Sequence, residues 1–163
     1  MVVPNGLLFG DGVAARVKER LLRESDLHTV VRLPDCVFAP YTIIPTNLLF
    51  FEKTGRTKEV WFYEIPPPEG RKKYSKTRPM RFEELVDCQA WWGGRAREGR
   101  VENECAWRVP IGEIEADGFN LDRKNPNRVD LAHRPPEELV AELIETEQEI
   151  MRLLDEIRSE LAQ

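Results

Sequence analysis

The chain has 163 residues, and its 41% hydrophobic content predicts one domain with a true core, alone or with an appended element. Its formal net charge of −5 is unevenly distributed: residues 1–80 contain 13 Lys and Arg against 9 Asp and Glu, whereas residues 81–163 contain 11 against 20. A basic first half and an acidic second half indicate different neighbours, although solvated charge is the default interpretation.

The cysteines and the apolar runs exclude several classes of protein. Cys36, Cys88 and Cys105 are far apart and form no Cys-x-x-Cys pair, so neither a zinc site nor a disulfide framework is expected. No apolar run approaches the roughly 18 residues of a membrane span, and the N-terminus lacks the basic start of a signal peptide. These features predict a cytoplasmic protein with reduced thiols, no metal site and no membrane partner.

The first 33 residues are expected to form a strand, a helix and a second strand. Residues 1–9 read as a short apolar strand with a Pro-Asn-Gly turn. Within 13–24, Val13, Val17 and Leu21 recur every fourth residue, which indicates an amphipathic helix with these side chains on its apolar stripe. Residues 27–33 are apolar at nearly every position, which is typical of a strand covered on both faces. This pattern predicts a βαβ unit.

A stiff loop follows this strand. It contains Pro34, Pro40 and Pro45, and it places the aromatic residues Phe38 and Tyr41 between them. Such rings are unusual on a loop between two buried strands, and they are the first candidates for contact with a ligand. Packing of Phe38 beneath the loop, as part of the core, is the alternative.

Two further strands, at 46–53 and 58–65, lie close enough in the chain to pair as a hairpin. The prolines at 66–68 then end regular structure, and the segment 69–81 that follows is strongly basic. A solvated connecting loop is slightly favoured for this segment, but its cations and its ring also suit phosphate binding and base stacking. The candidate DNA-binding residues are Arg71, Lys72, Lys73, Tyr74, Lys76 and Arg78.

The region before the tail is mixed. Residues 82–92 indicate a helix with Phe82, Leu85 and Val86 on one face, and residues 93–104 indicate a flexible polar connector. A short strand around Trp107 and a helical turn are expected next.

The pattern changes from Pro135 onward. Apolar residues alternate spacings of four and three, with Glu147 as a charged exception, which predicts a coiled-coil-like helix that faces a partner element or a second chain. The seam consists of Val140, Leu143, Ile150, Leu154, Ile157 and Leu161.

No self-contained active site is evident. Gly10-Asp11-Gly12 has neither the full Gly-x-Gly-x-x-Gly pattern nor a P-loop lysine, so a plain strand-to-helix turn is expected. His28 and His133 are expected to be structural or solvated, and no nucleophile–base arrangement can be argued.

Several linked segments nevertheless resemble a known family. They are "VVPNGLLFG…VKERLLRESDLHTVVRLPDCVFAPYTIIPTNLLFFEKTG", "EVWFYEIPPPEGRKKYSKTRPM" and "FNLDRKNPN". In this order and spacing they are similar to the C-terminal part of the methylation subunit of type I restriction-modification systems, which are adenine-N6 DNA methyltransferases. The resemblance covers essentially the whole chain.

The resemblance implies an α/β fold, the C-terminal portion of a Rossmann-like class I methyltransferase sheet, with the coiled-coil-like helix appended. Residues 1–66 would complete the methyltransferase core, 67–135 would hold the basic loop and the mixed region, and 136–163 would form the helical tail. Residues 1–9 would be the strand after the catalytic one, and 27–33 and 46–53 the last two strands, the final one antiparallel.

The resemblance also implies a site. An aromatic ring from the loop before the last strand would stack on a flipped adenine, with Phe38 the first choice and Tyr41 the second. Thr46 and Asn47 would help to line the pocket. The implied partners are DNA and the specificity and restriction subunits of the type I complex, and the open edge at residues 1–9 suggests self-association or a covering helix.

Two motifs of the family are missing. The sequence has no glycine-bearing loop after a first strand to bind S-adenosylmethionine and no Asn-Pro-Pro-Phe/Tyr motif to orient the adenine. The parent enzyme would use S-adenosylmethionine, but this chain alone is expected to bind no cofactor and to transfer no methyl group. A non-catalytic module that binds DNA or a partner through 69–81 and 136–163 is the alternative, and an unrelated small α/β domain is the least favoured reading.

Overall fold

A five-stranded sheet organises the first of two units, Met1–Arg128 and Val129–Gln163. The structure is a computed structural model that describes residues 1–68, 73–127, 144, 147 and 150–152. In chain order, the elements are β1 (Val2–Pro4), α1 (Asn5–Phe9), α2 (Val13–Glu24), β2 (Asp26–Arg32), β3 (Thr46–Glu52), β4 (Glu59–Glu64), the 3₁₀ helix η1 (Phe82–Leu85), α3 (Val86–Trp91), β5 (Ala106–Pro110) and α4 (Ile111–Ala116).

The strands are arranged in the order β1-β3-β2-β4-β5. Strand β3 is antiparallel to both β1 and β2, β4 is parallel to β2, and β5 closes the far edge antiparallel to β4. The expected antiparallel direction of the strand at 46–53 is therefore confirmed. Strands β1 and β2 run in the same direction, as in a βαβ unit, but β3 lies between them.

The predicted strand at residues 1–9 is wrong beyond Pro4. Proline has no amide hydrogen with which to extend the ladder, and here it is the residue that precedes helix α1. The helix places Leu8 in the core with none of its side chain exposed. Burial of Leu8 thus favours a helical turn where the apolar run alone indicated a strand.

The predicted hairpin between 46–53 and 58–65 is also wrong. Both edges of β3 are already occupied by β1 and β2, so the chain crosses the start of β2 and adds β4 on its other side. Thr57 lies at this crossing. Its Oγ1 accepts a hydrogen bond from the Leu27 amide and donates one to the Ser25 carbonyl, both at 2.8 Å.

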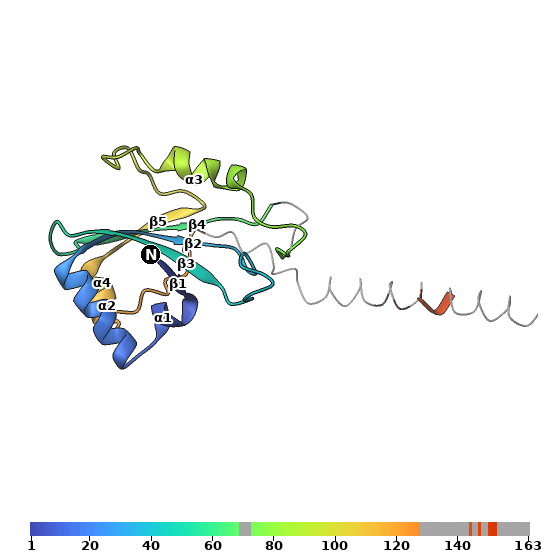
Figure 1. Ribbon diagram of the computed structural model, residues 1–163, viewed down its shortest axis with the longest axis horizontal. Coiled ribbons are helices and arrows are strands. Elements are labelled where there is room, and N and C mark those ends of the chain that lie inside the picture. Colours follow the sequence, from blue (N-terminus) through green and yellow to red (C-terminus); the bar gives the residue numbers. More distant parts are fainter. Residues whose placement is uncertain (69–72, 128–143, 145–146, 148–149, 153–163) are drawn as a thin grey trace, which may run out of the picture. The chain divides into compact units, whose positions relative to one another are not determined.

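Helices cover both faces of the sheet (Figure 1). On one face α1, α2 and α4 enclose a core in which Phe62 stacks on Trp107 with ring centroids 5.4 Å apart. On the other face η1 and α3 cover a smaller cluster around Tyr63. Neighbouring residues Val30 and Val31 are 0% and 2% exposed, as expected for a strand that is covered on both sides.

Of the apolar stripe predicted for α2, only Leu21 packs against the core. Val13 and Val17 are 67% and 53% exposed, whereas Lys18 and Leu22 are 2% and 1% exposed. The Lys18 ammonium donates a 2.6 Å hydrogen bond to the Leu8 carbonyl, which makes its burial tolerable. Burial lowers the pKa of Lys18, and the neighbouring Asp11 partly opposes that shift.

The predicted helix at 82–92 is present as η1 followed by α3, but of the three residues expected on one face only Leu85 packs against the sheet. Phe82 and Val86 are 67% and 52% exposed, while Cys88 is buried and Leu85 and Trp91 pack against the cluster beneath. Trp91 and Trp92 both pack against this cluster, at the end of the helix.

In the second unit the described residues, 144, 147 and 150–152, are helical. Ile150 is 52% exposed, and the other seam residues, Val140, Leu143, Leu154, Ile157 and Leu161, lie outside the described part of the chain. The seam therefore stays a prediction. Among the residues that the structure describes, none belongs to a helix that is both long and apolar enough to cross a bilayer.

Thr57→Val is expected to lower the free energy of unfolding by roughly 2–4 kcal/mol, because the buried Leu27 amide and Ser25 carbonyl both lose their partner. Urea denaturation of the variant measures the loss. Thr54→Val, a similar change at an exposed residue of the same loop, should stay within about 0.5 kcal/mol. Equal stability of the two variants would contradict the role assigned to the Thr57 hydroxyl.

Candidate functional site

The loop of residues 33–45 joins the carboxyl end of β2 to the amino end of β3. Its base is closed by hydrogen bonds from the Leu33 amide to the Thr46 carbonyl, at 3.1 Å, and from the Asn5 amide to the Pro45 carbonyl, at 2.8 Å. The loop thus starts where the parallel strands β1, β2 and β4 end, the edge at which open α/β sheets bind ligands.

The aromatic side chains of this loop face outward to different degrees. Phe38 is 39% exposed and Tyr41 is 93% exposed, and the Tyr41 amide donates a 3.0 Å hydrogen bond to the Phe38 carbonyl. Ile43 and Ile44, 72% and 55% exposed, extend the apolar surface. Phe38 is therefore not a buried core residue.

A cavity of about 290 Å³ lies beside the base of the loop. Asn47 lines it and is 2% exposed, and its Nδ2 donates a 3.2 Å hydrogen bond to Oδ1 of Asn5. Thr46 is buried in the ladder opposite Pro4 and is not among the lining residues. Of the four predicted pocket residues, only Asn47 lines this cavity. The structure adds Asn5, which the sequence analysis had placed only in a Pro-Asn-Gly turn.

Arg32 closes another side of the cavity and is held from a distant segment. Its guanidinium donates to Asp122 Oδ1 and to the Arg123 carbonyl, both at 2.6 Å. Further along, Asn127 Nδ2 donates to the Asn103 carbonyl at 2.9 Å. In the sequence, part of the segment 119–127 was noted only for its resemblance to a family. In the fold, this segment holds Arg32 at the carboxyl end of β2.

Only some of the DNA-binding residues predicted in the basic segment 69–81 are exposed in the described part of the chain. Lys73, Lys76 and Arg78 are exposed, while Arg71 and Lys72 lie outside the described residues. Tyr74 is 3% exposed and its hydroxyl donates to Glu84, so the prediction that its ring is available for stacking is wrong. The ring serves to attach the segment to η1.

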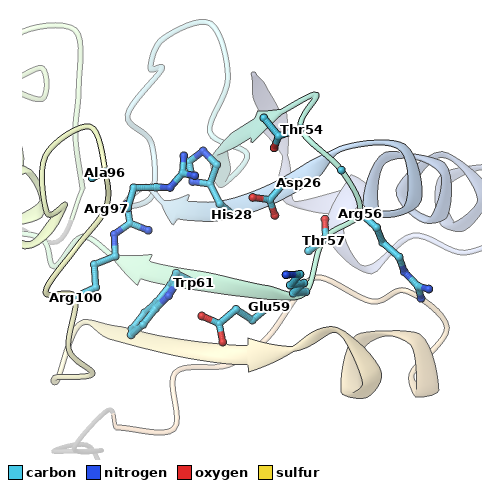
Figure 2. Close-up of a pocket in the computed structure, with 12 residues that line it drawn as sticks. Asp26, His28, Thr54, Arg56, Thr57, Glu59, Trp61, Ala96, Arg97 and Arg100 are labelled. Carbon is cyan, nitrogen blue, oxygen red and sulfur yellow. The ribbon is translucent and has the colours of Figure 1, made fainter.

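A larger cavity of about 730 Å³ lies at the opposite end of β2 (Figure 2). Asp26 and His28 line it from the start of that strand, Trp61 from β4, and Arg97 and Arg100 from the segment 93–104. This end of the sheet is the one away from the loop 33–45.

The segment 93–104 is not the flexible polar connector that was predicted. The Arg100 guanidinium lies 4.6 Å from the centroids of both Trp91 and Trp92, and it donates 2.9 Å hydrogen bonds to the Trp92 carbonyl and to Thr29 Oγ1. Arg97 forms a 2.9 Å ion pair with Glu52. Arginine stacking on aromatic rings is a tertiary interaction, which composition does not reveal.

His28 is neutral in this setting. Burial, followed by the charges of Arg97 and Arg100, lowers the pKa of His28 to about 4, against the opposing effects of Glu52 and Asp26. Within the described residues, no group of three or more His, Cys, Asp or Glu side chains is placed to hold a metal ion.

The turn Gly10-Asp11-Gly12 lies between α1 and α2, so it is not the strand-to-helix turn that was expected. A phosphate site of the Rossmann type requires a glycine-rich turn that leaves a strand and opens a helix. The described residues thus contain no counterpart of that site at this turn.

Comparison with known protein families assigns this chain to one of them. The model of the N-6 DNA methylase family matches residues 1–132. The chain belongs to the N-6 DNA methylase family.

Individual relatives agree with this assignment. The chain is 49% identical over 160 residues to the methylase subunit of the Escherichia coli type I restriction enzyme EcoEI, which covers 97% of this chain and 33% of that protein. It is 28% identical over 124 residues to the EcoKI methylase subunit of Escherichia coli K12, which covers 71% of this chain and 23% of that one.

Two solved structures share the fold. A type I modification subunit from Vibrio vulnificus YJ016 has a TM-score of 0.72 at 49% identity over 82% of this chain and 28% of its own. A chain from a study of the assembly of a type I restriction-modification system has a TM-score of 0.73 at 43% identity, covering 99% and 35%. The predicted resemblance to type I methylation subunits is confirmed, and the chain spans between 23% and 35% of the length of these relatives.

The stability of the protein is expected to fall as the pH decreases from about 6.5 to about 4, because the unfolded state takes up a proton on His28 that the folded state excludes. After allowance for partial solvent screening, His28 should contribute roughly 1–2 kcal/mol to this loss. Urea unfolding of the wild type and His28→Gln at pH 7, 6, 5 and 4 measures it as the difference between two curves. Parallel curves would show that His28 titrates normally in the folded protein.

Proposed function

We propose that this chain forms one wall of the target-base site of an adenine-N6 DNA methyltransferase that uses S-adenosylmethionine and acts in a type I restriction-modification complex. The observation that carries the proposal is the family match over residues 1–132, together with 49% identity to the EcoEI methylase subunit. In this proposal, β1, β2 and β3 are the last three strands of a Rossmann-like sheet. The order β1-β3-β2 with β3 antiparallel supports it.

The loop 33–45 is the part that would contact the substrate. A base extruded from the duplex loses its stacking energy, and an aromatic ring that stacks on it offsets that cost. Tyr41 and Phe38, 93% and 39% exposed, are available for such contact, and the loop joins the sheet next to the cavity of Asn5 and Asn47. The single bond from Asn47 Nδ2 to Asn5 Oδ1 leaves each amide with further donor and acceptor capacity for a base edge.

The residues of this chain do not fit the cofactor. S-adenosylmethionine supplies an electrophilic methyl group, and the family holds it on a glycine-bearing loop that follows a strand. Here the sequence has no such loop and no Asn-Pro-Pro-Phe/Tyr motif, and Gly10-Asp11-Gly12 lies between two helices. We therefore assign no catalytic step to this chain by itself. In this proposal, polypeptide outside these 163 residues supplies the cofactor loop and the Asn-Pro-Pro-Phe/Tyr motif.

Methyl transfer from tritiated S-adenosylmethionine to DNA tests the proposal. The purified chain alone should incorporate no label above a protein-free blank. Combined with a polypeptide that carries the cofactor loop and the Asn-Pro-Pro-Phe/Tyr motif of a type I methylase, it should give adenine methylation. Activity of the highly purified chain alone, or none in the combined sample, would overturn the proposal.

In the combined enzyme, alanine in place of the stacking ring should lower kcat/KM by about 10- to 100-fold, since base–aromatic stacking is worth roughly 1–3 kcal/mol. Phe38→Ala and Tyr41→Ala are compared, and Ile43→Ala, which removes an exposed apolar side chain from the same loop, is the matched control. The variant with the large loss identifies the ring that faces the base. Losses below two-fold for both aromatic variants would remove this role from the loop.

A second candidate function, DNA or partner binding without catalysis, is supported by the exposed cations of the basic segment. The turn from Ser75 to Arg78 is closed by backbone hydrogen bonds of 3.2 and 3.0 Å between these two residues. It holds Lys76 at its tip, where a phosphate has free access. The partner-binding part of this candidate depends on the seam of the C-terminal helix.

Replacement of Lys73, Lys76 and Arg78 by alanine should weaken duplex binding of the combined enzyme and reduce the slope of log K against log salt by about 2–3, near 0.9 for each lost phosphate contact. Fluorescence anisotropy at several salt concentrations provides both values. Arg20→Ala with Arg23→Ala, two exposed cations of α2, is the control. An unchanged slope would make the segment an ordinary surface turn.

A further inference from the structure

The cavity at the amino end of β2 concentrates positive charge in a chain whose net charge is −5 (Figure 2). Its volume of about 730 Å³ lies within the range of sites that hold a small molecule, roughly 300–1,000 Å³. Four cationic side chains line it against two carboxylates: Arg56, Lys58, Arg97 and Arg100 against Asp26 and Glu59. An anion is therefore the kind of ligand that the charge of this cavity favours.

Arg100 is a cation that is fixed in place and lacks a carboxylate partner. Hydrogen bonds of 2.9 Å to the Trp92 carbonyl and to Thr29 Oγ1 hold its guanidinium. In the part of the chain that the structure describes, this guanidinium forms no ion pair, and its buried Nη2 has no acceptor. Burial of an unpaired charge is costly, and an anion bound nearby would offset that cost.

Arg97 brings a second guanidinium to the same place. Burial, followed by the charge of Arg97, lowers the pKa of Arg100 to about 10, so the two cations are close enough to repel each other. Glu52, which pairs with Arg97 at 2.9 Å, does not line this cavity, and its side chain is 49% exposed. An exposed ion pair is worth only about 0–1 kcal/mol, so it is a weak competitor for a bound anion.

His28 adds an uncharged N–H donor. Thr29 is fully buried, and its Oγ1 accepts the hydrogen bond from Arg100. Within the described residues, the Thr29 hydroxyl hydrogen has one acceptor, His28 Nδ1, 2.8 Å away. The hydroxyl therefore donates to Nδ1, and the neutral imidazole carries its own hydrogen on Nε2. His28 thus keeps Nε2–H as a donor for a ligand.

We propose that this cavity binds the phosphate group of a small molecule, either free phosphate or a nucleotide, through Arg97, Arg100 and His28. A phosphate monoester carries a charge of about −1.5 to −2 at pH 7 and three acceptor oxygens, which matches two guanidinium charges and an imidazole N–H. Trp61 lines the remaining volume, where a nucleoside has room. The site does not depend on the proposed function, because it lies at the end of β2 away from the loop 33–45.

Isothermal titration calorimetry of the whole chain with inorganic phosphate, AMP and adenosine tests the proposal. Phosphate and AMP should bind, and adenosine, which has no phosphate, should bind at least about ten-fold more weakly than AMP. An affinity for AMP about ten-fold or more above that for phosphate identifies a nucleotide as the ligand. Equal affinities of AMP and phosphate identify the phosphate group alone.

Arg97→Gln should weaken the binding of AMP and phosphate by about ten-fold, because one of the two guanidinium charges is lost. The matched control is Arg20→Gln, which also removes an arginine that forms a 2.9 Å ion pair with a glutamate, but outside the cavity. This control should bind within about two-fold of the wild type. Circular dichroism checks that both variants fold.

A measurement on the unaltered chain locates the ligand even if Arg97→Gln does not fold. The imidazole NMR signals of His28, assigned by their loss in His28→Gln, should shift as phosphate is added. The shift should saturate with the dissociation constant that calorimetry gives.

Four results would overturn the proposal: no binding of either phosphate or AMP, adenosine binding as tightly as AMP, equal losses in Arg97→Gln and Arg20→Gln, or unmoved His28 signals at saturation. Binding of a DNA duplex that Arg97→Gln weakens, without binding of phosphate or AMP, would also overturn it, since the cavity would then contact nucleic acid.

Discussion

Strand β2 is the element on which the rest of the structure depends. It is hydrogen-bonded to β3 on one edge and to β4 on the other, and both of its faces are covered. The Thr57 side chain ties the crossing segment to its start, and Arg32 ties the segment 119–127 to its end. A strand held in this way is rigid, so the two cavities at its ends have one fixed wall each.

The arginine side chains at the two ends of β2 have different kinds of partner. At the carboxyl end, the Arg32 guanidinium is oriented by a carboxylate and a backbone carbonyl, which fixes its direction beside the cavity of Asn5 and Asn47. At the amino end, the Arg100 guanidinium lies against two indole rings, and burial lowers its pKa to about 10. Burial lowers the pKa of His28 most, and the charges of Arg97 and Arg100 lower it further, so His28 is neutral.

Local patterns predicted correctly what depends on nearby residues. The continuous apolar run around Val30 and Val31 indicated a strand covered on both faces, and the strand around Trp107 was also located. Sequence patterns gave the wrong prediction where a contact with a residue distant in the chain determines whether a side chain is buried or ordered. The burial of Lys18 depends on a hydrogen bond to the Leu8 carbonyl, that of Tyr74 on a hydrogen bond from its hydroxyl to Glu84, and the position of Arg100 on two tryptophan rings. Neither periodicity nor composition contains those contacts.

The sequence by itself determined the family, through linked segments that match in order, and the direction of the strand at 46–53 that follows from the resemblance. It also singled out the loop with Phe38 and Tyr41. Only the tertiary structure decided that β4 joins the far side of β2, that Asn5 meets Asn47, and that Val13 and Val17 remain exposed. The reason is physical: strand order and the choice of inward helix face are settled by competition among distant surfaces for burial, and no single segment carries that information.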